Sequence, residues 1–577
     1  MSLRFPARRI AVGRALAALI ALGSQRLTAQ AAPKPTFDVI IAGGRVVDGT
    51  GAPWMRADVG IVGDRIMRIG NLAGASAKHR IDATNLVVAP GFIDMLGQSE
   101  FNILVDNRAA SKILQGITTE ITGEGTSIAP LNERTLKEDF GGQAAHRGVT
   151  IDWRTLAEYF ARLERQTHPA INLGTFVGAG TIRNYVIGKD ERPATAAEMA
   201  EMKRLVAQAM EQGALGVSSS LQYVPDRFAS TDELVELATV AAKYGGIYIT
   251  HQRSEGVKIF ESVDEVITIA ERAKIPAEFF HLKTAYKANW GKMPDVLARI
   301  RAARARGLDI TANQYPYVRA SNGLDACLPI WVREGGKEKM IARLKDPMQR
   351  ERIKREMDDP IGVGWENQWF GSGGGNGILL TTVLTAELKQ YEGKTLTEIG
   401  RMMGTDPRDA VMDLVIADRG ESSVVTSIMA EEDVRLALKD PLVAVGTDSP
   451  AMAEDGPLSD TKSHPRAWGS FPRILGKYVR DEQLLTLEEA IRKMTSRAAI
   501  RVGIADRGIL RAGMMADIAI FDPATIRDVS TFDDPSHYST GMKYVLVNGR
   551  AVVADGKITK ERPGRPLRGP GYTRRAR

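Results

Sequence analysis

Four ionisable residues stand at the ends of short apolar, β-branched runs. His251 ends YITH, His281 ends FFH, Asp448 follows LVAVGT, and Glu124 follows ITTEITG. Two imidazoles with a carboxylate are standard ligands for a zinc-like divalent ion, and a further carboxylate beside the ion can take a proton from water. Any one of these residues could instead be a hydrogen-bonded core residue. Their coincidence at strand ends favours a hydrolytic metal site.

The elements that must position these residues are βα units. β-branched runs alternate with amphipathic helical stretches, such as 195–212 and 293–306, which is typical of helices around a parallel sheet. The eight candidate strands are 89–94, 117–122, 172–177, 215–218, 246–250, 277–281, 308–313 and 442–447. Eight strands with crossovers predict an α/β fold of the (β/α)8 TIM barrel type, in which residues at the C-terminal strand ends form the active site.

Two β-rich segments flank this region. Residues 37–88 and 507–560 each contain short strands punctuated by glycine, and neither is large enough for its own core. They predict a small β-sandwich domain assembled from both ends of the chain. The barrel then covers residues 89–506. A long insertion at 320–440, between the seventh and eighth strands, is expected to form walls or a lid over the site.

The net charge of +7 on the 577 residues lies at the two ends of the chain. Residues 1–31 carry +5 and residues 560–577 carry +6, so the body between them stands at −4. A basic groove for nucleic acid is therefore not expected. Residues 561–577 are rich in proline, glycine and arginine, a composition that predicts a basic disordered tail.

The N-terminal segment has the features of a signal peptide. Arginines precede a short apolar stretch from Ala15 to Gly23, and Ala29-Gln30-Ala31 fits the small-x-small cleavage pattern. We expect residues 1–31 to direct export to the periplasm or the medium. The Arg8-Arg9 pair leaves a twin-arginine route open, and an accidental apolar N-terminus is the alternative. The apolar stretch is too short for a stable membrane anchor. Cys327 is the only cysteine, which excludes an intrachain disulfide.

The order and spacing of several motifs carry a resemblance to a known family. Over residues 37–560 the chain resembles the D-aminoacylase (N-acyl-D-amino-acid deacylase) branch of the metal-dependent amidohydrolase superfamily. The motifs are FDVIIAGGRVVDGTG, APGFID, GITTEITGEG, GALGVSSSLQY, THQRSEG, HLK, the YPY of ANQYPYV, AEEDV, VGTDSP, HPRAWGSFPRILGKYVR and GILRAGMMADIAIFDP. Each motif is weak alone, and their combination is specific.

The chain also departs from the family pattern. Members usually carry His-x-His after the first strand, where GFIDMLGQSE places Leu96 and Gln98. The family's cysteine ligand after the second strand is replaced in the stretch 123–125, where Glu124 is the obvious oxygen substitute, although the cysteine could align with Gly125. The resemblance therefore implies one zinc-like divalent ion held by Glu124, His251 and His281. A weaker second metal using Gln98, Glu100 and Asp448 stays open, as does the identity of the ion.

Asp448 is expected to act as base and then acid, taking a proton from water and delivering it to the leaving amine. An amino-acid product carries a carboxylate, and Arg466 in HPRAWG is the best candidate to grip it with two parallel hydrogen bonds. By resemblance, Lys283, Tyr315 and Ser321 join Arg466 in binding the substrate. Tyr223 either lines the acyl side or serves only in packing.

The sequence thus predicts an exported amidohydrolase that cleaves N-acyl-D-amino acids or related small amides. Its partner would be a small-molecule amide with a free carboxylate, and homo-oligomers stay possible. The alternatives are a cyclic-amide hydrolase or dipeptidase of the same superfamily, and a non-catalytic binding protein that kept the barrel. The presence of Glu124, His251, His281 and Asp448 together favours the enzyme.

Overall fold

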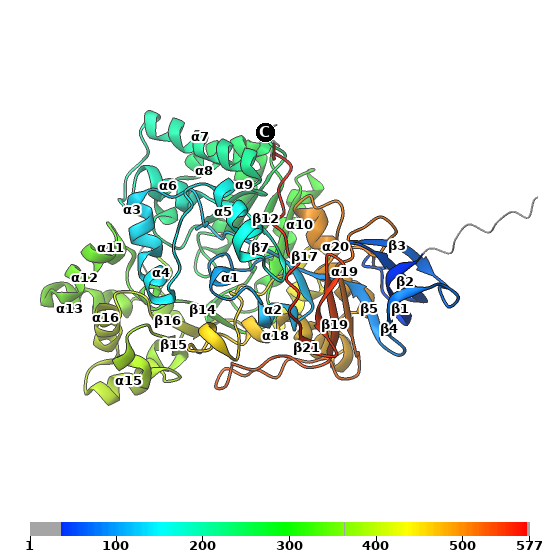
Figure 1. The fold of residues 1–577 in the computed structure, drawn as a ribbon. Coiled ribbons are helices and arrows are strands. Elements are labelled where there is room, and N and C mark those ends of the chain that lie inside the picture. Colours follow the sequence, from blue (N-terminus) through cyan, green and yellow to red (C-terminus); the bar gives the residue numbers. More distant parts are fainter. Residues whose placement is uncertain (1–35, 363, 574–577) are drawn as a thin grey trace, which may run out of the picture.

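A computed structural model describes residues 36–362 and 364–573 as an α/β protein with several sheets (Figure 1). The predicted signal peptide, residues 1–31, lies outside the described residues. Within the described part of the chain, no helix combines the length and the hydropathy needed to cross a bilayer.

The two ends of the chain share one sheet of nine strands, on the right in Figure 1. Its strands are β1 Phe37–Val46, β2 Met55–Val62, β3 Arg65–Gly70, β4 Ala77–Asp82, β5 Val87–Pro90, β18 Ile518–Phe521, β19 Met542–Val547, β20 Arg550–Ala554 and β21 Lys557–Ile558. β5 joins the two groups, because it pairs in parallel with β1 and antiparallel with β18. Apolar residues from both ends form one buried cluster, including Ile41, Val59 and Ile518.

A second group of strands runs in parallel through the middle of the molecule. These strands are β6 Phe92–Asp94, β7 Ile117–Thr122, β8 Asn172–Thr175, β9 Val177–Gly178, β10 Gly216–Ser220, β11 Ile247–His251, β12 Ala277–Phe279, β13 Ile310–Gln314 and β17 Val443–Val445. Each of the eight predicted strands overlaps one of them. The predicted strand 89–94 is in fact divided, since residues up to Pro90 belong to β5 in the terminal sheet and β6 begins at Phe92.

The parallel strands are ordered as β6-β7-β8 and as β9-β10-β11-β12-β13-β17. β9 follows β8 after one residue, and an isolated parallel bridge between Gly97 and Ser449 links the segments that follow β6 and β17. Every residue of these strands is buried, which explains why their sequences show no strict alternation of apolar and polar residues.

Helices connect successive parallel strands and cover them. α7 Ala196–Gln212, α8 Thr231–Lys243, α9 Ile259–Ala273 and α10 Met293–Ala305 follow β9, β10, β11 and β12. α7 shows why the sequence folds this way: Thr195 and Glu198 form a capping box at its start, and Gly213 ends it with a φ of 111°. Its buried residues are Met202, Leu205, Val206, Ala209 and Met210, spaced to form one helical face.

Among the described residues, the remaining α-helices outside the 319–427 region are α1 Asn102–Val105, α2 Ala110–Ile113, α3 Glu133–Thr135, α4 Gly141–Arg147, α5 Leu156–Arg162, α6 Ala179–Val186, α17 Glu431–Lys439, α18 Arg466–Arg473, α19 Leu487–Met494 and α20 Ser496–Arg501.

Between β13 and β17 the chain builds a separate lobe, at the lower left of Figure 1. Its antiparallel sheet consists of β14 Arg319–Gly323, β15 Ile378–Thr382 and β16 Ser423–Ser427. Its helices are α11 Ile330–Arg333, α12 Lys337–Lys345, α13 Pro347–Met357, α14 Gln368–Gly371, α15 Leu396–Met403 and α16 Pro407–Ala417. The lobe has its own hydrophobic cluster, which includes the fully buried Leu324, Leu380 and Val424.

The C-terminal segment differs from the prediction of a disordered tail. Residues 561–573 lie along the molecule, and a parallel bridge joins Pro566 to Leu173 in β8. Arg565 forms an ion pair with Asp64 at 2.8 Å, and Arg568 forms one with Glu164 at 2.8 Å. The composition, rich in proline, glycine and arginine, predicted disorder, but Arg565 and Arg568 have partners far away along the chain. Residues 574–577 are outside the described part.

Candidate metal centre

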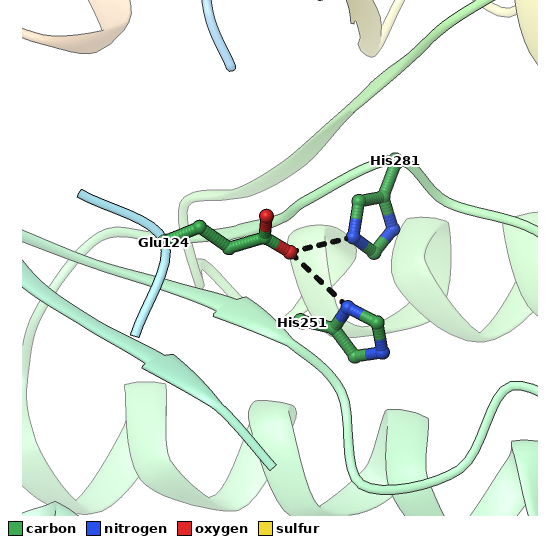
Figure 2. Close-up of side chains that lie close together, drawn as sticks. All are labelled: Glu124, His251 and His281. Carbon is green, nitrogen blue, oxygen red and sulfur yellow. Dashed lines mark hydrogen bonds and ion pairs between the residues drawn. The ribbon is translucent and has the colours of Figure 1, made fainter. Parts of the chain in front are cut away.

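The three predicted metal ligands meet at the C-terminal ends of three parallel strands, of which two, β11 and β12, are paired. Glu124 follows β7, His251 is the last residue of β11, and His281 follows β12. Glu124 Oε1 lies 3.1 Å from His251 Nδ1 and 2.7 Å from His281 Nε2. Figure 2 shows both imidazoles turned toward this one carboxylate oxygen. The three ligand atoms lie within 4.8 Å of one another, a donor set and spacing that fit one divalent ion.

The electrostatics of the cluster also suit a cation. Burial alone would raise the pKa of Glu124, but the two imidazoles outweigh it and hold this pKa well below its ordinary value. Burial and Lys283 act to lower the pKa of His281. The carboxylates of Asp448, Glu124 and Glu255 outweigh both and raise it to about 9. The site therefore attracts positive charge, which a proton supplies when no metal is bound.

Glu255 is a site residue that the sequence analysis missed. Its Oε1 lies 3.1 Å from His281 Nδ1, and its Oε2 lies 3.8 Å from His251 Nε2. A carboxylate behind a ligand imidazole fixes the tautomer and the ring orientation and makes the ligand more basic. The available signal was its position in HQRSEG, four residues beyond a predicted ligand at a strand end.

Lys283, predicted to bind substrate, lies in the same network. Its Nζ is 2.7 Å from Glu255 Oε1 and 2.6 Å from His281 Nδ1. The ammonium therefore contacts the outer side of a ligand imidazole, while the residue also lines the cavity.

Asp448 is held by donors on both carboxylate oxygens. Arg466 Nη1 lies 2.6 Å from Asp448 Oδ2, and Gln98 Nε2 lies 3.0 Å from Asp448 Oδ1. Burial raises the pKa of Asp448 above its ordinary value despite the opposing guanidinium of Arg466. Asp448 and His281 have positive φ values of 52° and 33°, a conformation that is uncommon outside glycine and is concentrated at functional sites.

A cavity of about 250 Å³ opens onto these groups. Its lining includes the three ligand residues, Asp448 and four of the predicted substrate-binding residues: Lys283, Tyr315, Ser321 and Tyr223. Asn322 from β14 donates to the Tyr223 hydroxyl at 3.2 Å, so the 319–427 lobe contributes directly to the wall.

Arg466 is placed differently from the prediction. The cavity lining includes Asp448 but not Arg466, whose guanidinium lies over the Tyr315 ring at 4.7 Å from the ring centre. Its Nη2 donates to the backbone oxygen of Ser321 at 3.3 Å. In this structure Arg466 therefore holds the proposed base instead of facing the space for a substrate carboxylate.

Comparison with known proteins agrees with this geometry. The model of the amidohydrolase family matches residues 395–553. The D-aminoacylase of Alcaligenes xylosoxydans xylosoxydans is 34% identical over 534 residues, which cover 92% of this chain and 97% of that protein.

Two solved structures extend the comparison. The N-acyl-D-glutamate deacylase of Bordetella bronchiseptica, complexed with zinc and a phosphonate mimic of the tetrahedral intermediate, has a TM-score of 0.76 and 31% identity. The match covers 93% of this chain and 100% of that one. A D-aminoacylase structure also has a TM-score of 0.76, with 33% identity over 92% of this chain and 100% of that one. Its binuclear centre is described as activated by one metal and attenuated by a second.

Converging imidazoles and a carboxylate at the ends of parallel strands, with an acid across the cavity, define a metal-binding hydrolase. The chain belongs to the D-aminoacylase family of amidohydrolases, enzymes that hydrolyse linear amide bonds.

Proposed function

We propose that the protein hydrolyses the amide bond of N-acyl-D-amino acids or related small peptide-like amides. The observation that carries the proposal is the convergence of Glu124, His251 and His281 on one point of a cavity that Asp448 also lines. The relatives named D-aminoacylase and N-acyl-D-glutamate deacylase support the substrate class.

We propose that one divalent ion, zinc, is held by Glu124, His251 and His281. When bound, the ion supplies polarisation of the scissile carbonyl and lowers the pKa of water. Zinc in the Bordetella deacylase structure supports this choice.

Asp448 would accept the proton of the attacking water at its carboxylate and return it to the leaving amine. Arg466 and Gln98 position this carboxylate, and the guanidinium favours its ionised, proton-accepting form. Burial raises the pKa of Asp448, which makes its carboxylate a stronger base than an exposed one.

The carboxylate of the substrate would be bound by Lys283, Tyr315 and Ser321, which line the same cavity and carry ammonium and hydroxyl groups. Arg466 would join them only if its guanidinium turned away from Asp448. Tyr223 contacts His251 edge-on with ring centres 5.1 Å apart, and we assign it to the acyl side.

The architecture proposed for this site is a closed (β/α)8 barrel with a terminal β-sandwich. The parallel pairing from β6 to β17, together with the bridge between Gly97 and Ser449, supports closure. The shared buried cluster of both chain ends supports a single terminal domain.

Export is a separate proposal that rests on residues 1–31 alone. Fractionation of cells that express the full chain tests it: the mature protein is expected outside the cytoplasm. An uncleaved protein retained in the cytoplasm would refute it.

The activity is tested with zinc-loaded protein beginning at residue 32, offered matched N-acyl-D- and N-acyl-L-amino acids, dipeptides and cyclic amides. Cleavage of the N-acyl-D series is expected. Equal cleavage of both enantiomers would remove the D-specific part of the proposal. Preference for cyclic amides or dipeptides would favour those alternatives, and no turnover together with no bound metal would favour a binding protein.

A further inference from the structure

We propose that the side-chain amide of Gln98 takes the place of a second metal ion. It donates hydrogen bonds to both Glu124 and Asp448 and so keeps the metal centre mononuclear. The proposal rests on the metal-dependent function proposed above. It concerns the position where other members of the superfamily carry the second histidine of His-x-His.

The geometry of the amide is the main observation. Gln98 Nε2 lies 3.1 Å from Glu124 Oε2 and 3.0 Å from Asp448 Oδ1. An ionised carboxylate only accepts hydrogen bonds, so the NH2 end of the amide must face both acids, one hydrogen to each. The amide oxygen is the only atom of Gln98 that could bind a metal, and it is turned away from both carboxylates.

The backbone around Gln98 fixes this placement. Gly97 N–H donates to Ile121 O at 2.8 Å on the β7 side, and Gln98 N–H donates to Ser449 O at 3.2 Å on the β17 side. Asp448 N–H in turn donates to Leu96 O at 2.7 Å. The side chain of Gln98 therefore starts between the two segments that carry Glu124 and Asp448.

Glycine is required at the preceding position, residue 97, because the backbone there lies against a buried side chain. A Cβ atom on Gly97 would collide with the carboxylate of Glu120, which accepts the Ser99 N–H at 3.1 Å. The close approach of Gly97 to Glu120 brings the 97–99 segment down onto the strand ends and leaves Gln98 directed at the two acids.

Asp94 and Glu120, next to the 96–98 segment, share one buried cation within the protein. The fully buried ammonium of Lys112 lies 2.8 Å from Asp94 Oδ2 and 3.4 Å from Glu120 Oε1. Thr447 Oγ1 is a further partner of Lys112, at 2.7 Å. Because Arg466 already pairs with Asp448, the three carboxylates of Asp94, Glu120 and Asp448 each have a cationic partner within the protein.

The residues of a second metal site do not fit such an ion. Leu96 is 1% exposed and packs in an apolar cluster with Ile93 and Met95, so it offers no ligand. Among the described residues, Glu100 is absent from the cavity lining, which does include Gln98 and Asp448. The open possibility of a second metal held by Gln98, Glu100 and Asp448 is therefore disfavoured by this arrangement.

The test measures zinc per chain by mass spectrometry after dialysis of purified protein against excess zinc. The wild type is expected to hold one zinc. Gln98→Glu replaces the donor between the two acids with a third carboxylate and is expected to hold two. Gln222→Glu is the matched control, because Gln222 lines the same cavity without bridging the acids, and it is expected to stay at one.

Two zinc ions in the wild type, one in Gln98→Glu, or two in Gln222→Glu would each overturn the inference. If Gln98→Glu does not fold, Gln98→His is measured in its place, with the same expected gain of one zinc and the same refutation. The count needs no substrate, so the two proposals fail separately. A wild-type protein with one zinc and no amidase activity sinks the proposed function alone, whereas an active protein with two zinc ions sinks only the role of Gln98.

Discussion

On one side of the cavity, Glu124, His251 and His281 direct their ligand atoms at a common point, with Glu255 behind the imidazoles. On the other side, Asp448 faces the same cavity, but its two oxygens are already occupied by Gln98 and Arg466. Both sides are rich in carboxylates. The difference lies in what each arrangement leaves available: Glu124, His251 and His281 bring three ligand atoms within 4.8 Å of one another, which fits one divalent ion, whereas both oxygens of Asp448 accept hydrogen bonds from side chains of the protein itself.

The largest effect is expected from removing a ligand on the first side. His281→Ala should abolish tight zinc binding and lower kcat/KM at least about a thousandfold, since it removes several kcal/mol of transition-state stabilisation. Metal analysis and steady-state kinetics check this. His537→Ala is the control, because His537 is exposed and pairs only with Asp534. Retained zinc and activity in His281→Ala would contradict the assignment of the first side as the metal-binding side.

Removing the base on the second side should separate chemistry from metal binding. Asp448→Asn keeps the shape of the side chain but cannot accept the proton, so kcat is expected to fall about 10²- to 10⁴-fold. Zinc should stay near one per chain, measured on the same samples. A variant that loses its zinc would place Asp448 among the ligands and contradict the division proposed here. Asp455→Asn, at an exposed ion pair with Arg108, serves as the control.

A smaller effect is expected from changing Glu255, which contacts the outer side of the ligand imidazoles. Glu255→Gln removes the negative charge that orients His281, and zinc affinity should fall about 10- to 100-fold. Competition with a chelator of known affinity measures this. Glu265→Gln is matched in chemistry, and the Glu265 side chain is 12% exposed against 7% for Glu255. The partners of Glu265 are Arg253 and Thr231 and none of the three predicted metal ligands, so zinc affinity should not change. Equal losses in both variants would point to general destabilisation.

The last prediction concerns the dependence of zinc affinity on pH, which is at most about tenfold for each pH unit. In the metal-free protein the pKa of His281 is raised to about 9, so this imidazole is protonated at neutral pH and must release its proton to bind a metal. Zinc affinity should therefore rise with pH up to about 9, by up to about tenfold per unit. Calorimetry at pH 7 in two buffers of different ionisation enthalpy should show about one proton released. Binding without proton release would refute this.

The fold was largely predictable because buried parallel strands produce recognisable apolar runs. Those runs place His251, His281 and Asp448 at strand ends, where a single sequence already suggests chemistry. The roles of Glu255 and Gln98 were not predictable in this way. Glu255 follows its strand by four residues, and the function of Gln98 depends on two acids that approach it only in the fold.

The prediction of a disordered C-terminal segment was wrong for a related physical reason. Its arginines find Asp64 and Glu164 hundreds of residues earlier in the chain, and its backbone pairs with Leu173. Composition reports what a segment lacks locally, and it carries no information on acceptors that another part of the fold provides.

The sheet shared by the two chain ends also delays one strand pairing until late in synthesis. β5 ends at Pro90, and β18, its antiparallel partner, begins at Ile518. At about 5 to 20 residues per second, β5 waits about 20 to 90 s on the ribosome before that partner emerges. During this interval one of its edges is unpaired and open to wrong strands. The arrangement that completes the terminal sheet therefore makes the nascent chain dependent on protection of this edge until translation is almost finished.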